Sequence, residues 1–563
     1  MKNNKILTAF LFSALSLTAV SCSDAYLDIN DNPNSIQAEE ITPELIIPGA
    51  ITQAYRTQGG TMMQFGNLMM NSWAGNTYSF GGPFAREFNL ATVDNTFYTG
   101  IWGLYPRIAN FAQVEVYPNA DHKQDNYVAI AKIMKAFYMQ YIVDLYGDAP
   151  YSEAFKGQDN LTPKYDNDTD IYKDLIAGLE EANALIDAGN GSPADSDVVF
   201  KGDMSKWKKF SNTIKLRMLI RMSNVTGELA TYRDAKLQTL AGASFIDPTS
   251  HPEDTNPPSL FAGTADNVTV NPGYTASNDD QMNPYILNWA RNASGTAVQN
   301  YSIVVVSEHF ANSMEGNQIL NDPNYSKFNN ILDPRKNRLF TSVTGGVRYN
   351  GTPYSGLKGI RQGAVPGQPG APVASPNTSK LAANNFSGGN PISTWNDVID
   401  ANNLRGGVLM SVAESQFLQA EAALRWPAIF TFSAEDKFKE GIRASAIWIG
   451  TPTVNNSQWN TYMTNISTRP GLGWVGTNTQ KLEAIMTQKW IALTNVNPTE
   501  MFIEYNRTGY PWTPLAVTAQ RPNKPYRLVY PFTEYGANAA NVPNITGADV
   551  FVKNQYTPFW NQN

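Results

Sequence analysis

The sequence predicts a mostly α-helical protein in which antiparallel helix pairs form a scaffold that carries long loop-rich excursions. Apolar residues recur at helical spacing in two blocks of the chain, about 40–225 and 405–510. Between them, at about 226–404, Pro, Gly, Asn and Ser are frequent and no period is sustained. Loops of this length are usually functional or disordered, so we expect the excursion to form a binding face.

The clearest helix signal runs from Asn126 to Tyr146, and Gly147 and Pro150 are expected to end it. Further helices are expected from Ile171, around Trp207, and in the C-terminal block. Their apolar faces are marked by Ile171, Leu175, Leu179, Ala182 and Ile186; by Trp207, Phe210, Ile214 and Met218; by Met410, Ala413, Phe417, Ala420 and Leu424; by Ala434, Phe438, Ile442 and Ile449; and by Leu482, Met486, Trp490 and Leu493. Helix pairs of this kind resemble tetratricopeptide-type hairpins, although no regular repeat of about 34 residues is visible.

The N-terminus has the features of a cleaved export signal. Lys2 and Lys5 precede an apolar run, Ile6–Val20, which is shorter than the roughly 20 residues that a membrane-spanning helix needs. Small residues then lead to Cys22, an arrangement that resembles the lipobox of bacterial lipoproteins. We therefore expect residues 1–21 to be a signal peptide, Cys22 to be lipidated, and 22–563 to form one domain. An ordinary secretory signal with a chance cysteine is the alternative.

Composition excludes several classes of protein. Hydrophobic residues make up 42% and charged residues 16% of the 563 residues, as in a globular protein and unlike a disordered one. The net charge of −7 argues against a nucleic-acid partner, which would require a basic surface. Cys22 is the only cysteine, so we expect no disulfide.

No motif for catalysis, metal or cofactor binding stands out. The three histidines, His122, His251 and His309, are far apart, and no phosphate-binding loop or nucleophile elbow occurs. The run Asp166–Asp170 imitates the start of a calcium loop, but Ile171 and Ala177 stand where such a loop needs Gly and Glu. It is better interpreted as the cap of the helix expected from Ile171. A carboxylate pair for glycoside hydrolysis remains open, because sequence does not show separations in space.

Aromatic residues in polar loops are the candidates for ligand contact, because exposed rings can bind the apolar faces of sugars. Packing beneath a loop is the alternative for each one. The candidates are Trp73, Asn76 and Tyr78 in a polar loop, and Tyr285, Trp289, Tyr354 and Trp395 in the excursion.

Several longer segments carry a family resemblance. They are Tyr26–Asn30, Tyr146–Ala154, Trp207–Asn212, Asp333–Arg335, Ala413–Ala422, Gly441–Ser445, Gln488–Ala492 and Glu504–Pro511. Together they span nearly the whole chain and resemble the SusD/RagB family of outer-membrane nutrient-binding lipoproteins, in particular its SusD-like branch. Asn506 departs from the pattern, which has Arg there.

The resemblance implies a non-catalytic, lipid-anchored outer-membrane protein that delivers captured nutrient to a SusC-like TonB-dependent barrel. Ser23, Asp24 and Asp28 resemble a tract that sends such lipoproteins to the cell surface. An oligosaccharide is the expected ligand and a peptide the alternative; a surface glycoside hydrolase and a ligand-free adaptor are the other hypotheses. Within this fold we expect Arg443 and Arg507 to pair with buried acids or helix ends, and Trp490 to lie in the core.

Overall fold

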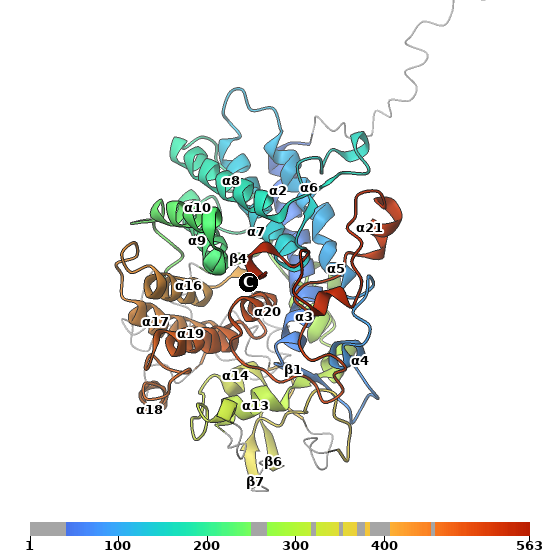
Figure 1. Cartoon of the computed structure of the whole chain (residues 1–563), viewed down its shortest axis with the longest axis vertical. Coiled ribbons are helices and arrows are strands. Elements are labelled where there is room, and N and C mark those ends of the chain that lie inside the picture. Colours follow the sequence, from blue (N-terminus) through green and yellow to red (C-terminus); the bar gives the residue numbers. More distant parts are fainter. Residues whose placement is uncertain are drawn as a thin grey trace, which may run out of the picture.

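The computed structural model confirms a mostly helical fold (Figure 1). The structure describes residues 41–248, 267–316, 323–347, 353–368, 378–382, 406–451 and 457–562. Cys22, His251, Trp395 and the residues before 41 lie outside the described residues, and the side chain of Tyr354 does too. The predicted division into signal peptide, scaffold and excursion stays a prediction.

Most helices of the first helical block lie in the upper part of Figure 1, while α3 and α4 lie lower in the view. Successive long helices pack side by side, α6 on α7, α7 on α8 and α8 on α9, as helix hairpins do. The helices of this block are α2 (Pro43–Thr57), α3 (Met63–Met69), α4 (Ala85–Asn89), α5 (Thr99–Trp102), α6 (Leu104–Glu115), α7 (Asp125–Tyr146), α8 (Asp168–Ala188), α9 (Met204–Arg221) and α10 (Gly227–Gln238). Since α10 follows residue 225, the helices extend past the predicted boundary.

Local signals explain where α7 and α8 begin and end. The helix α7 ends at Gly147, whose φ of 73° is one that glycine adopts without strain. The helix α8 begins at Asp168, three residues before the predicted start, because the Asn167 side chain accepts a hydrogen bond from Thr169 N at 3.0 Å. The acidic run is therefore a helix cap, as predicted.

The second block contains α16 (Val412–Arg425), α17 (Ala434–Trp448), α18 (Ser457–Ile466), α19 (Asn478–Leu493) and α20 (Pro498–Thr508). The pair α16 and α17 packs closely at Gly441, where an added Cβ would come within 2.7 Å of the Phe417 ring. Met410 is a correction to the predicted face of α16. It lies in a strand, because the Ser411 hydroxyl accepts a hydrogen bond from Glu414 N at 3.1 Å and so caps the helix after it.

Short strands form two-stranded sheets in the described ranges, and two of these sheets connect distant parts of the chain. They form two-stranded antiparallel sheets: β1 (Trp73–Gly75) with β5 (Val304–Val306), β2 (Ala149–Pro150) with β3 (Tyr165–Asp166), β4 (Val268–Val270) with β8 (Gly407–Met410), and β6 (Val343–Val347) with β7 (Pro353–Gly356). The described helices of the excursion are short, and they are α11 (Pro284–Trp289), α12 (Gln299–Ile303), α13 (Glu308–Glu315) and α14 (Lys336–Leu339). The excursion is thus pinned to the scaffold by β1–β5 and β4–β8.

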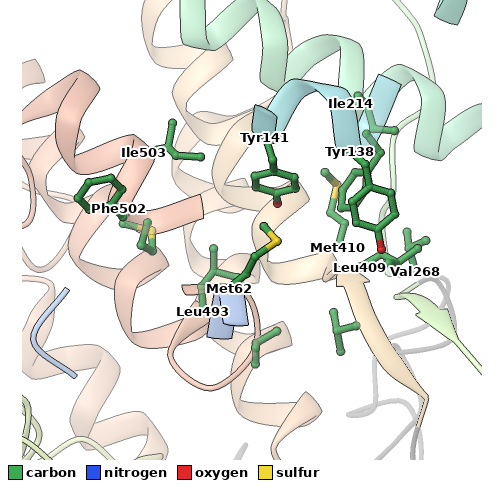
Figure 2. Packing of buried hydrophobic residues seen from close by; sticks show 14 of the residues in the cluster. Met62, Tyr138, Tyr141, Ile214, Val268, Leu409, Met410, Leu493, Phe502 and Ile503 are labelled. Carbon is green, nitrogen blue, oxygen red and sulfur yellow. The ribbon is translucent and has the colours of Figure 1, made fainter. Parts of the chain in front are cut away.

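Both helical blocks contribute to one buried core. Figure 2 shows Tyr138 of the first block close to Leu409 and Met410, and Leu493 of the second block beside Met62. Trp490 is buried in the same cluster, as the sequence predicts. Apolar burial on this scale is the main favourable term in folding.

A buried ionic centre also joins the blocks. Arg221 of α9 contacts Glu500 and Glu504 of α20 at 2.7 Å and Asp144 of α7 at 3.2 Å. Arg217 contacts Glu414 of α16 at 3.1 Å. Each of these charges has a partner, which a buried charge requires.

The expectation that Arg507 pairs with a buried acid is confirmed, whereas the acid nearest to Arg443 is only partly buried. Arg507 extends the ionic centre by bonding both oxygens of Glu421 at 2.7 Å, and Arg443 lies 3.6 Å from Glu440. Burial alone would raise the pKa of Glu504, but Arg507, Lys489 and Arg221 hold it well below its usual range.

The C-terminal tail wraps over the first block. Leu528 N donates to Leu145 O at 2.7 Å, and Phe559 N donates to Asp168 Oδ2 at 2.8 Å. The short helix α21 (Phe532–Ala537) lies on this path, and the chain ends near the middle of the view in Figure 1.

Candidate functional site

Most of the predicted ligand residues that the structure describes converge on one place. The loop after α3 and the excursion meet where β1 pairs with β5, with Trp73 opposite Val306. The Trp73 and Trp289 rings meet edge to face, with centroids 4.9 Å apart. No local pattern indicates that these residues, which are more than 200 positions apart, are neighbours.

The two tryptophans and Tyr285 are nevertheless part of the core. Their exposed fractions are 0% for Trp73, 3% for Trp289 and 2% for Tyr285. Trp73 Nε1 donates to Asn495 Oδ1 at 2.7 Å, and Trp289 Nε1 donates to Gly59 O at 3.0 Å. This corrects the exposed platform that the sequence predicted: β-pairing and these hydrogen bonds bury the rings, so they offer no open face to a ligand.

Asn76 is used to hold its own loop. Its Nδ2 donates to Ser302 O at 3.0 Å and to Ser79 Oγ at 3.1 Å, while its Oδ1 accepts from Tyr78 N at 3.2 Å. Because the amide is 2% exposed and its bonds are made within the protein, it shapes the loop rather than facing a ligand.

Tyr78 keeps part of its surface exposed, alone among the predicted residues whose side chains the structure describes. It packs against Ala74, Val305 and Ile360, and burial raises the pKa of its hydroxyl. Phe80 and Phe84 follow in the same loop and are also half-buried. These three residues, which we call the loop aromatics, are the candidates for ligand contact. Tyr354 in β7 and Trp395 remain predictions.

One further aromatic residue was not predicted. Tyr301 of α12 is half-buried, and two cations lie over its ring: Arg291 Cζ at 4.4 Å from the centroid and Lys380 Nζ at 5.4 Å. Cation–π contacts of this kind hold a ring in a fixed orientation. No sequence spacing signals this cluster, because its members come from three separate segments.

The residues considered for metal binding and catalysis have structural partners. His309 is buried, its Nδ1 lies 2.6 Å from the Tyr325 hydroxyl, and burial lowers its pKa to about 3, so it is neutral. His122 Nδ1 lies 3.3 Å from Asp125. Among the described residues, no three His, Cys, Asp or Glu side chains gather as a metal would require.

The carboxyl group of Asp168 has a strongly raised pKa. Burial raises its pKa to about 7, and nearby Asp148 adds to the shift. Asp148 accepts a hydrogen bond from Asp168 N at 2.9 Å, and Asp168 in turn accepts one from Phe559 N in the tail. This pair therefore sits beneath the C-terminal tail, where it fastens that segment to the start of α8.

Comparison with known proteins identifies the family of this chain. The sequence profile of the SusD-like family, described as starch-binding and associating with the outer membrane, matches residues 33–531. The chain belongs to the SusD-like family. Members of this family have a nutrient-binding role and associate with the outer membrane. They are known as binding proteins rather than enzymes.

Solved SusD-like structures share the fold. A chitin-binding protein is 24% identical, with 89% of this chain and 95% of that chain covered and a TM-score of 0.63. A chitin-binding SusD homologue from Flavobacterium johnsoniae is 21% identical over 92% of this chain and 98% of its own, with a TM-score of 0.62. A SusD-like protein from Bacteroides thetaiotaomicron is 21% identical over 89% and 94%, with a TM-score of 0.60.

No curated protein matches this chain. Among the described residues, no helix is long and apolar enough to cross a membrane.

Proposed function

We propose that this SusD-like protein captures an oligosaccharide at the cell surface, without altering it, and delivers it to a SusC-like TonB-dependent barrel. Family membership is the observation that carries the proposal. Two similar solved structures are described as chitin-binding, which supports a glycan as the ligand class. Lipidation of Cys22 would hold the protein at the outer membrane.

The loop aromatics are the proposed contact surface. Sugar rings present an apolar C–H face that packs on an aromatic ring, so a platform needs rings that keep exposed surface. Tyr78, Phe80 and Phe84 meet this requirement, while Trp73, Trp289 and Tyr285 do not. Asn76 fixes the loop that carries Tyr78, which keeps the platform ordered before the ligand arrives.

Calorimetry on the purified chain tests the ligand class. Starch-derived oligosaccharides, chitin-derived oligosaccharides and a peptide pool are titrated separately, and the ligand is analysed afterwards. We expect saturable binding of one glycan class with the ligand recovered intact. Binding of the peptide pool alone would favour the peptide alternative, and a cleaved glycan would contradict a purely binding role.

A matched pair of variants tests the platform. Tyr78→Ala is expected to weaken glycan binding about tenfold, because an aromatic contact is lost. Tyr117→Ala removes a half-buried tyrosine after the end of α6 and is expected to leave affinity unchanged. Wild-type affinity for the glycan in both variants would show that the loop aromatics are not the site.

The anchor and the partner need separate experiments. Cys22→Ala is expected to release the protein from the outer-membrane fraction and to abolish incorporation of a labelled fatty acid. Co-purification of a TonB-dependent barrel with the wild-type protein, from membranes of the native host, would support the transporter partner. Its absence after cross-linking would contradict it.

A further inference from the structure

A pocket lies in the helical scaffold, and none of the loop aromatics lines it. It has a volume of about 400 Å³, within the range of small-molecule sites. It is lined by side chains from α10, from the C-terminal end of α16 and from the start of α19. Its lining includes Trp426, Arg233 and Arg425, and it contains no acidic residue, although the whole chain carries a net charge of −7.

Trp426 supplies an aromatic wall in a fixed orientation. The ring is half-buried, and the Arg233 guanidinium lies 5.6 Å from its centroid. Arg233 is itself held by Asp234 at 2.8 Å and by Met222 O at 3.1 Å. The charge of Arg233 is therefore paired within the protein, and its role in the pocket is to position the Trp426 ring.

Arg425 differs from Arg233 because part of its guanidinium is not bonded. Its Nε donates to Glu421 at 2.6 Å, while its two Nη groups have no partner among the described residues. Glu421 is buried and already accepts two hydrogen bonds from Arg507. Arg425 is therefore anchored at Nε and presents free donors with a positive charge, which suits bidentate binding of a carboxylate.

The remaining polar groups have the character of a sugar site. Asn478 and Thr479 are exposed in the first turn of α19, and their side chains form no hydrogen bond within the described residues. They line the same pocket as Trp426 and Arg425. An amide and a hydroxyl of this kind can bond ring hydroxyls, while Trp426 packs on the ring face.

From this pocket we infer a second glycan-binding site specific for acidic sugars, in which a uronic-acid ring packs on Trp426 and its carboxylate binds Arg425. The inference rests on the pocket alone and does not require that the loop aromatics bind the same glycan. A site of this kind would hold an acidic branch or a neighbouring residue of a chain that the protein captures.

Calorimetry on the purified full chain tests the inference with two probes that differ only in charge. One is the α-1,4-linked trimer of galacturonic acid, and the other is its methyl ester. We expect saturable binding of the acid, at least about tenfold weaker binding of the ester, and a loss of affinity for the acid as salt rises. Equal affinity for both probes, or no binding of the acid, would overturn the inference without using any variant.

Three variants assign the binding to this pocket. Arg425→Gln should weaken binding of the acid about tenfold and leave the ester unchanged, and Arg507 still pairs with Glu421 in this variant. Trp426→Ala should weaken both probes. Lys439→Gln, an exposed site on α17 that pairs with Glu435, is the control and should change neither. Binding of the acid that survives both pocket variants would place it elsewhere, for example at the loop aromatics, where Tyr78→Ala would then reduce it.

Discussion

The ionic centre and the Trp73–Trp289 cluster are both buried, and both consist of residue types that often mark functional sites. They differ in how their polar groups are satisfied. In the ionic centre, Arg221 is surrounded by three carboxylates from two helices. In the tryptophan cluster, each ring uses its single N–H to bond a group on another segment.

The two clusters therefore stabilise the fold by different means. The ionic centre depends on pairing, so removal of one member takes an opposite charge away from several buried groups at once. The tryptophan cluster depends on packing, so removal of one member leaves a cavity. Neither cluster presents an open surface, in contrast to Tyr78 and Trp426, which are half-buried.

The largest expected effect comes from breaking the ionic centre. Arg221→Met should lower the free energy of unfolding by about 4–5 kcal/mol, because Asp144, Glu500 and Glu504 lose their shared partner. Urea-induced unfolding followed by circular dichroism measures this change. A loss below about 1 kcal/mol would mean that the carboxylates become neutral at little cost.

Breaking the tryptophan cluster should have a slightly smaller effect. Trp73→Ala should lower the free energy of unfolding by about 3–4 kcal/mol, since a fully buried ring is removed and Asn495 loses its donor. The same unfolding experiment applies. An unchanged stability with weakened glycan binding would instead restore Trp73 as a ligand residue.

A third variant compares the paired charges of the ionic centre with an unpaired one. Lys524 is buried, its ammonium bonds the Thr513 hydroxyl and lies 4.2 Å from the Tyr505 ring centroid, and burial lowers its pKa to about 7. Because the folded-state pKa is depressed, the unfolded chain binds the proton more tightly, and stability should rise as pH increases from about 7 to about 10.

Lys524→Met should therefore stabilise the protein by about 2 kcal/mol at pH 7, after the lost hydroxyl and ring contacts are offset. The difference from wild type should shrink as pH approaches 10, and unfolding at several pH values measures it. A difference that stays constant with pH would show that Lys524 keeps its proton over the whole range.

The smallest effect is expected for an exposed pair. Lys439 contacts Glu435 at 2.7 Å on α17, and both side chains are about half exposed. Lys439→Met should change the free energy of unfolding by less than about 0.5 kcal/mol, because solvent and salt screen such pairs. A loss comparable to that of Arg221→Met would contradict the distinction between buried and exposed charges.

Helix positions could be predicted from sequence because periodicity and caps act locally. The ends of α7 follow directly from Asn126–Tyr146 and Gly147, and the Asp166–Asp170 run was correctly interpreted as a cap. Met410 was misplaced because its apolar spacing fits a helix as well as the strand that Ser411 ends. A local pattern does not reveal pairing with Val268, which lies more than 100 residues away.

The candidate site was predicted only in part, for the same reason. Trp73 and Trp289 are predicted as ligand residues from their polar surroundings in sequence, but both are buried by contacts between distant segments. The sequence around Tyr78 and Tyr301 does not distinguish the two residues. Only the structure shows that Arg291 and Lys380 lie over the Tyr301 ring. The pocket at Trp426 joins three helices and left no trace in the sequence spacing.

The path of the C-terminal tail has a consequence for the order of folding. The carbonyl of Leu145 and the carboxylate of Asp168, at the end of α7 and the start of α8, accept hydrogen bonds from the backbone N–H groups of Leu528 and Phe559. Contacts between residues so far apart in sequence carry a large entropic cost of loop closure and form late in folding. The first block therefore receives its last hydrogen bonds only when the far end of the chain has docked on it.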